Sequence, residues 1–531
     1  MSGPGPGRAD ARRLVTITAA AIVLVAAALR CAWPTQVDWD SDTALHYLRA
    51  AELGRGERLD LLAGYRTHAG GARLSPLFHY VLAVPSLLGG GPIASVLWVG
   101  LADLAVVLLL IGPGRRVWGQ RVALGAAALY AALAAVVLRA RALHNETLLA
   151  PLAVALLLAL AYARRRPASR AAGWGLAVVG IMPQLHLSSL FLLPGAGAAL
   201  LPRLRRAGLR AALPGLALVG VAAAPYLVHE TRGGFAETRA LLRGAGGADQ
   251  PGEKETVHAR GAERLTLGPR ALAGLLGTSD VGWLLGPTLE PRVRRGLLAL
   301  LRGAASLSAW LLPLAAGAGL LLGLSGRLGR ELRLVAILVL STLLTFAALG
   351  VRAGTPYVVQ LLPLLCLLAA GACLAAWRAA PQAPSLRAAL RVALTAACGV
   401  ALAGQAALAG AGVAAVARAG GAPDRPFRLT YGVTRAAADW LLERELALAR
   451  FPAWQHCLML DVAWRELPPA RAGRFQPRRE VLRYWDLPYL IPVPRGPLRT
   501  VSLVEVGPDD PPPAGALARF GALVVVEEPG Q

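Results

Sequence analysis

Long runs of apolar residues without a single charge constrain this chain more than any other feature. Residues 14–29 and 334–349 are two such runs. A helix of about 20 apolar residues crosses the hydrocarbon core of a bilayer, and soluble proteins rarely contain several such uncharged runs. Because 56% of the residues are hydrophobic and only 16% are charged, the sequence predicts an all-α polytopic membrane protein.

The apolar runs divide the chain into about eleven predicted spans. We place them near residues 14–33, 93–111, 121–138, 147–163, 171–183, 187–201, 211–228, 304–324, 334–350, 356–377 and 392–416. Two of them, 171–183 and 187–201, are short and flank Pro183. A single broken hairpin there would lower the count.

Positive charge is concentrated in clusters that separate the apolar runs. A net charge of +24 would indicate nucleic-acid binding in a soluble protein, but in this arrangement no nucleic-acid partner is expected. The clusters lie at Arg8–Arg13, Arg115–Arg121, Arg164–Arg170, Arg203–Arg210, Arg327–Arg333 and Arg378–Arg391. The alternate short connections hold only Arg139, Arg141 and Arg352. The positive-inside rule therefore predicts an inner or plasma membrane protein with a cytoplasmic N-terminus and an extracytoplasmic C-terminus.

Two segments need a separate interpretation. Residues 76–88 are apolar, but the Gly-Gly-Gly-Pro segment 89–92 follows without a positive charge. We therefore expect a juxtamembrane helix on the outer surface, where His79 and Tyr80 serve surface packing. Residues 8–31 combine arginines with an apolar run and three alanines, so a cleaved signal peptide is the alternative to a first span.

The sequence divides into two expected domains. Residues 1–416 form a transmembrane domain with outer loops 34–92 and 229–303, and residues 417–531 form a small extracytoplasmic α/β domain. In the second domain we expect a helix over 434–444 and strands over 498–506 and 522–527. The five cysteines include no CxxC pair, so neither a disulfide framework nor a thiolate metal site is indicated.

An acidic string follows the first predicted span, on the side away from the N-terminal arginines. It places Asp38, Asp40 and Asp42 close together at a membrane surface. A span needs no such cluster for its stability, so the string suggests a reaction on hydroxyls or cations outside the cytoplasm. The alternative is structural, because Asp42 precedes a helix-like segment 43–53 that ends at Gly54, and would then be its N-cap.

Five separated motifs fall on this same side of the membrane in the predicted topology. They are Asp40-Ser41-Asp42 followed by Ala50 and Gly56, Ser75 to Tyr80, Arg141 with Glu146, Gln184 to Ser188 followed by Pro194, and Arg352 to Tyr357 followed by Pro363. Together they resemble the GT-C type of integral-membrane glycosyltransferases, which includes protein O-mannosyltransferases and aminoarabinose transferases of lipid A. Thr43 departs from the pattern, since many members have an acidic residue there, so either Asp40 or Asp42 is the catalytic acid.

The resemblance implies transfer of a sugar from a polyprenyl-phosphate carrier to an extracytoplasmic hydroxyl acceptor, which is a glycolipid, a polysaccharide or a protein. It implies Asp40, Asp42 and Glu146 as catalytic residues and Arg141, His186, Arg352 and Tyr357 as substrate-binding residues. The chemistry agrees, because an acceptor hydroxyl needs a positioned carboxylate as general base, and the departing phosphate needs cations or donors nearby. Arg139 is an alternative to Arg141 in the second role.

This reading makes two spatial predictions. Asp40 or Asp42 should lie beside Glu146, and His186 should share one cavity with Arg352. Each residue also has a structural alternative. Glu146 would cap the span that follows it, His186 would be a packed interfacial residue, and Arg352 would be an anchor that reaches the lipid headgroups.

Other functions stay open. A transporter or flippase of lipid-linked saccharides should bury polar groups in several spans, but only Asp103 and Gln405 stand out, and no repeat relates the two halves. A non-catalytic assembly protein and a polysaccharide polymerase are further alternatives. An Asp-x-Asp pair can hold a divalent metal, but a monophosphate donor demands less charge neutralisation, so the metal is left open and no other cofactor is expected.

Overall fold

The fold was analysed in a computed structural model of the full chain. The structure describes residues 6–63, 73–167, 169–245, 295–349, 355–379, 383–419, 430–450, 454–482, 487–495, 499–506, 511–521 and 523–528, with a few positions between 264 and 276. The described helices are α1 Pro6–Cys31, α2 Ser41–Gly54, α3 Leu77–Leu87, α4 Pro92–Leu109, η1 Leu110–Gly114, α5 Arg115–Trp118, α6 Gln120–Ala132, α7 Ala134–Arg139, η2 Asn145–Leu148, α8 Leu149–Arg165, α9 Ala171–Leu185, η3 Leu187–Leu192, α10 Leu193–Ala207, α11 Leu209–Arg232, α12 Ala236–Ala245, α15 Arg295–Leu324, α16 Arg330–Leu349, η5 Thr355–Leu361, α17 Leu362–Arg378, α18 Pro384–Ala419, α19 Tyr431–Glu443, α20 Trp454–Arg465 and α21 Pro469–Ala472.

Within the described residues, nine helical stretches are long and apolar enough to cross a membrane. They are Arg12–Cys31, Pro92–Trp118, Asn145–Arg165, Leu187–Ala207, Leu209–Arg232, Ser306–Leu324, Arg330–Leu349, Val358–Arg378 and Pro384–Ala414. Each overlaps one of the spans expected from the sequence. The remaining two expected spans are shorter helices in the structure: α9 covers 171–183, and α6 with α7 covers 121–138.

The expected span 121–138 is broken at Leu133, whose ψ of 114° is not helical. The break frees the backbone N–H of Ala134, which donates to the Gln405 side-chain oxygen of α18 at 3.2 Å. The Gln405 amide nitrogen donates in turn to Ser308 Oγ at 2.9 Å. Because an unpaired backbone group is costly away from water, Gln405 has a structural reason to lie in a span.

Asp103, the other polar residue of the expected spans, is also paired. Arg30 Nε of α1 donates to its carboxylate at 2.7 Å, and the Tyr130 hydroxyl donates to the second oxygen at 2.5 Å. The contact joins α1, α4 and α6 inside the bundle. Since both polar positions hold helices together, neither supplies the buried substrate path that a transporter requires.

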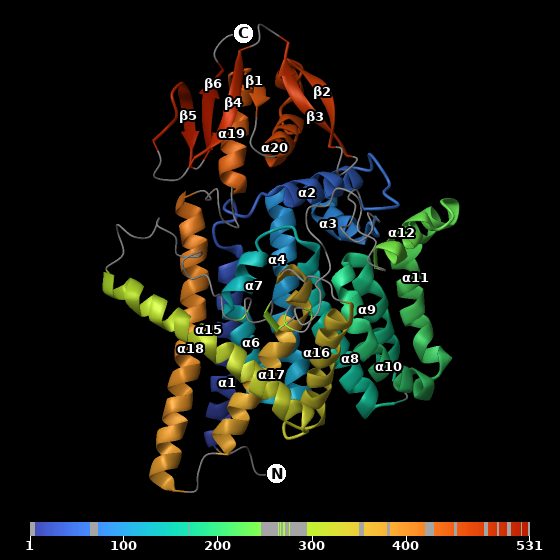
Figure 1. The fold of residues 1–531 in the computed structure, drawn as a ribbon, viewed down its shortest axis with the longest axis vertical. Helices are drawn as coiled ribbons and strands as arrows, with labels where there is room; N and C mark the ends of the chain where they lie inside the picture. Colours follow the sequence, from blue (N-terminus) through green and yellow to red (C-terminus); the bar gives the residue numbers. More distant parts are fainter. Residues whose placement is uncertain are drawn as a thin grey trace.

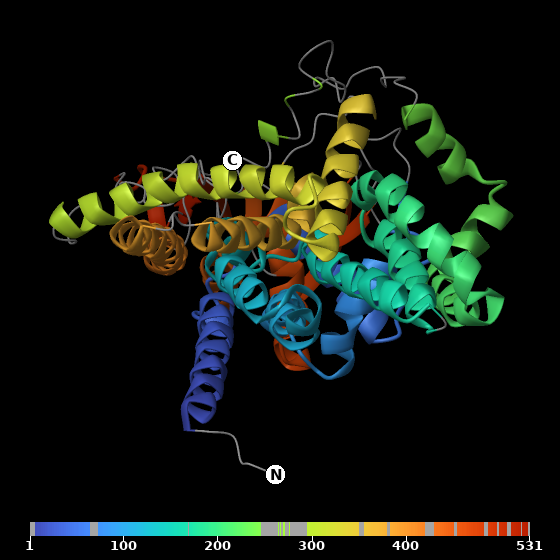
Figure 2. The ribbon, with the colours of Figure 1, turned by 90° about the horizontal axis from the view of Figure 1, so that it is seen from below.

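Two short helices lie across one end of the bundle, between it and the C-terminal domain (Figure 1). They are α2 and α3, which pack against each other. The helix expected over 76–88 is therefore present as α3, while its position at a membrane surface stays a prediction. The N-terminal end of α1 lies at the opposite end of the bundle (Figure 1), and α15 crosses α18 along one flank of it (Figure 2).

The C-terminal region is a small α/β unit, as expected. Its strands are β1 Ala447–Arg450, β2 Phe475–Leu482, β3 Leu487–Pro494, β4 Thr500–Glu505, β5 Ala516–Phe520 and β6 Leu523–Glu527. One sheet has the order β1-β4-β6-β5, with β1 parallel to β4, and β2 pairs with β3 as a separate antiparallel sheet. The expected helix over 434–444 corresponds to α19, and the two expected strands correspond to β4 and β6.

Candidate functional site

The acidic string begins α2, and its middle aspartate caps that helix. Asp40 has extended backbone geometry, and its Oδ1 accepts the Thr43 N–H at 2.7 Å. The N-cap is therefore Asp40, and the structural alternative that assigned the cap to Asp42 is wrong. Asp42 lies in the first turn instead, where a carboxylate is favoured by the partial positive charge of the helix end.

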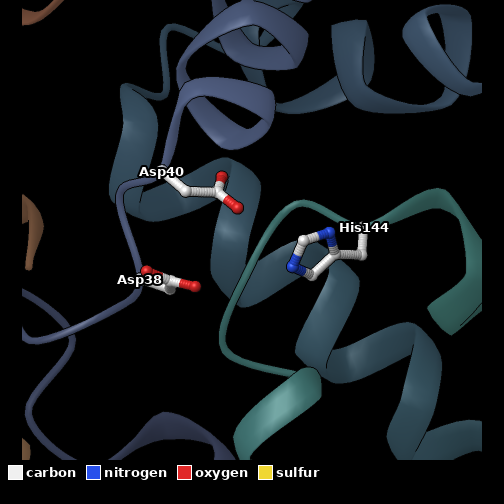
Figure 3. A group of neighbouring side chains, drawn as sticks. All are labelled: Asp38, Asp40 and His144. Atoms are coloured by element: carbon white, nitrogen blue, oxygen red, sulfur yellow. The ribbon is translucent and has the colours of Figure 1, made fainter. Parts of the chain in front are cut away.

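The connection between α7 and η2 packs directly against this string, and it is called the second outer loop because the predicted topology places it second on that side. Asp38 N–H donates to the Arg141 carbonyl at 3.0 Å, and Leu143 N–H donates to the Thr43 hydroxyl at 3.4 Å. These contacts place two distant loops side by side. Figure 3 shows the carboxyl groups of Asp38 and Asp40 directed toward the space that the His144 ring also faces.

Asp38, Asp40 and His144 are close enough to bind one ion. One ligand atom from each lies within 4.8 Å of the others. Metal–ligand bonds of about 2.0–2.6 Å allow ligands on opposite sides of an ion to be nearly this far apart. Two carboxylates and an imidazole suit zinc or manganese. The Asp-x-Asp pair that could bind a metal is thus Asp38 and Asp40. Whether the protein binds a metal stays an open question.

Burial makes the carboxyl groups of the string unusual. It raises the pKa of Asp38 well above its ordinary value, and the neighbouring charge of Asp40 adds to this effect. Burial also raises the pKa of Asp42 to about 7, helped by Asp40 and opposed by His144. A carboxyl group with a pKa near neutrality can exchange a proton at physiological pH, as a general base must.

Arg141 does not face this site. Its guanidinium is buried and donates to four backbone carbonyls, those of Leu29, Arg30, Trp33 and Gln36, at 3.1–3.4 Å. The side chain closes the C-terminal end of α1 and holds the segment that leads to the acidic string. These four hydrogen bonds give Arg141 a structural role, and its expected substrate contact stays a prediction.

Arg139, the alternative cation, lies at the end of α7 and is partly buried. Burial lowers the pKa of its guanidinium, while the negative charges of Glu146 and Asp40 oppose that change. Both acids therefore lie within electrostatic reach of Arg139. Of the two arginines near this site, Arg139 is the one whose pKa responds to the charges of Asp40 and Glu146.

Glu146 and His186 face each other at the base of the site. His186 Nε2 lies 3.8 Å from Glu146 Oε1, too far for a direct hydrogen bond. The Ser188 N–H donates to His186 Nδ1 at 3.1 Å, so in the neutral ring Nε2 carries the proton and points toward Glu146. Burial lowers the pKa of His186. Glu146 lies in the first turn of η2, at the positive end of the span, as its structural alternative expects, and its carboxylate also faces the His186 ring.

Three spanning helices begin around this pair with a turn of 3₁₀ helix. The turns η2, η3 and η5 precede α8, α10 and α17, and η5 packs against both η2 and η3. Gln360 of η5 donates to the Ser188 carbonyl at 3.1 Å. Helix N-termini present free N–H groups and partial positive charge, so their convergence favours an anion.

Several buried acceptors of this region have no hydrogen-bond partner among the described residues. They are Glu146 Oε2, Thr147 Oγ1 and Gln360 Oε1. Buried polar atoms are nearly always paired, so a bound molecule with hydroxyl donors would satisfy them. Arg352 lies outside the described residues, and so does the Tyr357 side chain, so their expected places in the site stay predictions.

Two features of the site were not expected from the sequence. His144 directly precedes Asn145 and Glu146, and this polar triplet was the signal for it. His46 Nδ1 lies 3.0 Å from His79 Nε2 between α2 and α3, and both rings are buried. His79 packs between the two helices and is fully buried, because α3 turns it toward α2. Burial lowers the pKa of His46 to about 4, so the pair is neutral.

Comparison with known proteins shows which solved structures share this fold. No family model and no curated protein matches the chain. Among solved structures, ArnT from Cupriavidus metallidurans in the apo state aligns over 97% of this chain and 98% of its own length, with 15% identity and a TM-score of 0.54. The same protein bound to undecaprenyl phosphate gives 14% identity, 97% coverage of both chains and a TM-score of 0.49.

The apo oligosaccharyltransferase of Archaeoglobus fulgidus aligns over 86% of this chain and 65% of its own, with 13% identity and a TM-score of 0.48. At such identities the similarity shows the fold alone, and the alignment with apo ArnT shows it over nearly the whole of both chains. The chain has the fold of the GT-C integral-membrane glycosyltransferases, with its membrane helices and C-terminal domain in the expected order.

Proposed function

We propose that this protein is a membrane glycosyltransferase that moves a sugar from a polyprenyl-phosphate carrier to a hydroxyl acceptor outside the cytoplasm. The observation that supports this most is the meeting of two loops. Carboxylates of the first outer loop lie against His144 of the second, next to a convergence of helix N-termini. A base beside an anion site is what transfer from a lipid phosphate requires.

Asp42 is the proposed general base. Its pKa of about 7 leaves a large ionised fraction at neutral pH while keeping proton affinity high. The carboxylate takes the proton of the acceptor hydroxyl as that oxygen bonds to the anomeric carbon. The bond between the anomeric carbon and the phosphate oxygen breaks in the same step, and the polyprenyl phosphate leaves. Asp40 holds the start of α2 through its hydrogen bond to Thr43.

The leaving phosphate is assigned to the region of Arg139 and His186. Arg139 contributes positive charge, His186 presents Nε2–H, and the starts of α8, α10 and α17 contribute backbone dipoles. Arg352 and Tyr357 are proposed to complete this half of the site from η5 and the segment before it. ArnT, whose apo form shares the fold, has been solved with undecaprenyl phosphate.

Asp38, Asp40 and His144 would hold a divalent metal, which would supply positive charge beside the leaving phosphate. The proposed base does not depend on it. Asp42 lies outside the three-residue group, and its proton transfer needs only the acceptor hydroxyl within reach. Glu146 is proposed to orient His186 and a sugar hydroxyl.

The test uses purified protein in lipid nanodiscs with a panel of polyprenyl-phosphate hexoses and pentoses. A cell-envelope extract supplies hydroxyl acceptors, and release of polyprenyl phosphate is followed by mass spectrometry, because this release reports sugar transfer without the acceptor being identified. We expect cleavage of one class of donor by the wild type, with and without added Mn²⁺, and its loss in Asp42→Asn. Binding or movement of intact donors across the bilayer without any cleavage would instead identify a flippase.

A further inference from the structure

The segment before the acidic string is held on two sides by parts of the chain that are distant in sequence. On one side, the Arg141 guanidinium donates hydrogen bonds to the carbonyls of Trp33 and Gln36. On the other side lies the start of the C-terminal domain. Tyr431 N–H donates to the Val37 carbonyl at 3.0 Å, and Gly432 N–H donates to the Thr35 carbonyl at 2.8 Å.

Side chains reinforce this backbone contact. Asp38 and Thr430 form an antiparallel β-bridge, and the Thr430 hydroxyl donates to the Gln36 side-chain oxygen at 2.8 Å. The rings of Trp39 and Tyr431 meet edge to face, with centroids 5.3 Å apart at 72°. Trp39 and Thr430 are fully buried. Contacts between buried groups of this kind hold a single arrangement because every alternative leaves polar atoms unpaired.

The contact leaves no spare space. A Cβ atom on Gly432 would lie 3.1 Å from both the Gln36 side-chain nitrogen and the Thr35 carbonyl oxygen. Thr430 is also the N-cap of α19, since its hydroxyl accepts the Val433 N–H at 3.5 Å. The first turn of the domain's helix is therefore the same structure that contacts the acidic string.

We infer that the C-terminal domain positions the catalytic carboxylates through this clamp, defined as Thr430, Tyr431 and Gly432. The inference rests on the proposed function. Asp38 lies inside the bridge itself, and Asp40, two residues later, caps α2, whose first turn carries Asp42. A shift of the clamp therefore moves these acids relative to His144. The three residues touch no reacting atom and act as positioning residues.

A second contact between the domain and α2 provides the matched control. Arg465 of α20 lies 3.7 Å from Glu52, and its side chain is partly exposed. Arg465 also donates to the buried Asp461 of its own helix at 2.5 Å, so its loss loosens α20 as well and makes it a stringent control for general destabilisation. Arg465→Gln therefore weakens the link between domain and α2 without touching the clamp.

The first experiment compares Thr430→Val, Gly432→Val and Arg465→Gln in the donor-cleavage assay. For the two clamp variants we expect kcat to fall by roughly 10–100-fold, because misplaced catalytic groups cost rate, with the donor KM close to wild type. Thr430→Ser should restore kcat, and Arg465→Gln should not change it. Thermal unfolding of each variant is measured alongside. Wild-type kcat in both clamp variants would overturn the inference.

The second experiment locks the clamp with a disulfide. A Cβ on Gly432 would lie 3.6 Å from Thr35 Cβ, within the roughly 3.5–4.5 Å that disulfides span. Thr35→Cys with Gly432→Cys should crosslink under mild oxidation. Because any Cβ at position 432 crowds Gln36 and the Thr35 carbonyl, the reduced double variant is the reference. Crosslinking should raise kcat above that reference, alone and in the Thr430→Val background, with thermal unfolding measured for both forms.

Each outcome separates the inference from the proposed function. Failure to crosslink would show that the clamp does not exist. A locked protein that is inactive until reduced would show that the domain must move, which contradicts fixed positioning. A wild type that cleaves no donor, yet crosslinks readily, would refute the proposed function while leaving the contact in place, and the positioning role would fall with it.

Discussion

His186 Nε2 lies 3.8 Å from Glu146 Oε1 although 40 positions separate the two residues in the chain. The gap is too wide for a direct hydrogen bond and wide enough for an oxygen atom of a ligand to interact with both. Glu146 offers acceptors, and the ring offers a donor whose tautomer is held by the Ser188 N–H. The pair therefore presents opposite hydrogen-bond polarity to whatever binds between them.

His186→Gln is expected to weaken binding of the polyprenyl-phosphate donor by about 10-fold, equal to about 1.4 kcal/mol, because the donor group on Nε2 is displaced. Donor affinity is measured by native mass spectrometry. Ser189→Ala is the control, since within the described residues that hydroxyl donates to the His186 carbonyl rather than to the ring. Equal donor affinity in wild type and His186→Gln would remove His186 from the donor site.

The two arginines of the second outer loop should behave differently. Arg139→Gln should lower donor affinity with little change in thermal unfolding, because Arg139 faces the site. Arg141→Gln should instead lower the unfolding temperature and the folded yield, because it leaves several buried carbonyls unpaired. Both are measured by donor titration and differential scanning fluorimetry. The reverse pattern would show that the structural role belongs to Arg139.

Stability should depend on pH through Asp42. Its pKa is about 7 in the folded protein and about 3.9 in an unfolded chain, so the folded state holds the extra proton between these values. Stability from this group is therefore present below pH 4 and lost as pH rises to 7. Asp42→Asn should raise the unfolding temperature relative to wild type at pH 8 and much less at pH 4.5. An equal difference at both pH values would contradict the raised pKa.

The proposed topology places the Arg164–Arg170 cluster and the C-terminal domain on opposite sides of the membrane. Arg165→Cys and Thr500→Cys, each made in a background without native cysteines, are labelled with an impermeant maleimide in intact cells. We expect labelling at position 500 alone, with position 165 labelled only after permeabilisation. Equal labelling of both from outside would reverse the assignment of sides.

The apolar runs were sufficient to predict the helical bundle, because lipid leaves the backbone few alternatives. They missed the break at Leu133, which depends on a side chain from a helix more than 250 positions away. Similarly, the acidic string could be recognised as a site, but its N-cap could not be assigned. Asp40 and Asp42 are two positions apart in the sequence, and only the extended backbone at Asp40 shows which of them is the N-cap.

Arg141 shows a second limit. In the sequence it is one of two arginines beside an acid, and nothing local separates them. Its burial follows from contact with the end of α1, far away in sequence. The pairing of Asp38 with His144 and of His46 with His79 is equally non-local. Sequence patterns predicted which loops carry the site, and the contacts between loops determine which side chains face it.

The most direct test of the proposed mechanism is the rate of polyprenyl-phosphate release from the cleaved donor, measured for wild type, Asp42→Asn and Asp40→Asn across pH 5–9. The account predicts a wild-type rate that rises with an apparent pKa near 7 as Asp42 loses its proton. It predicts a loss of roughly 10²–10⁴-fold in Asp42→Asn, with an unfolding temperature at or above that of wild type. Undiminished cleavage in Asp42→Asn, with the same pH profile as wild type, would contradict it.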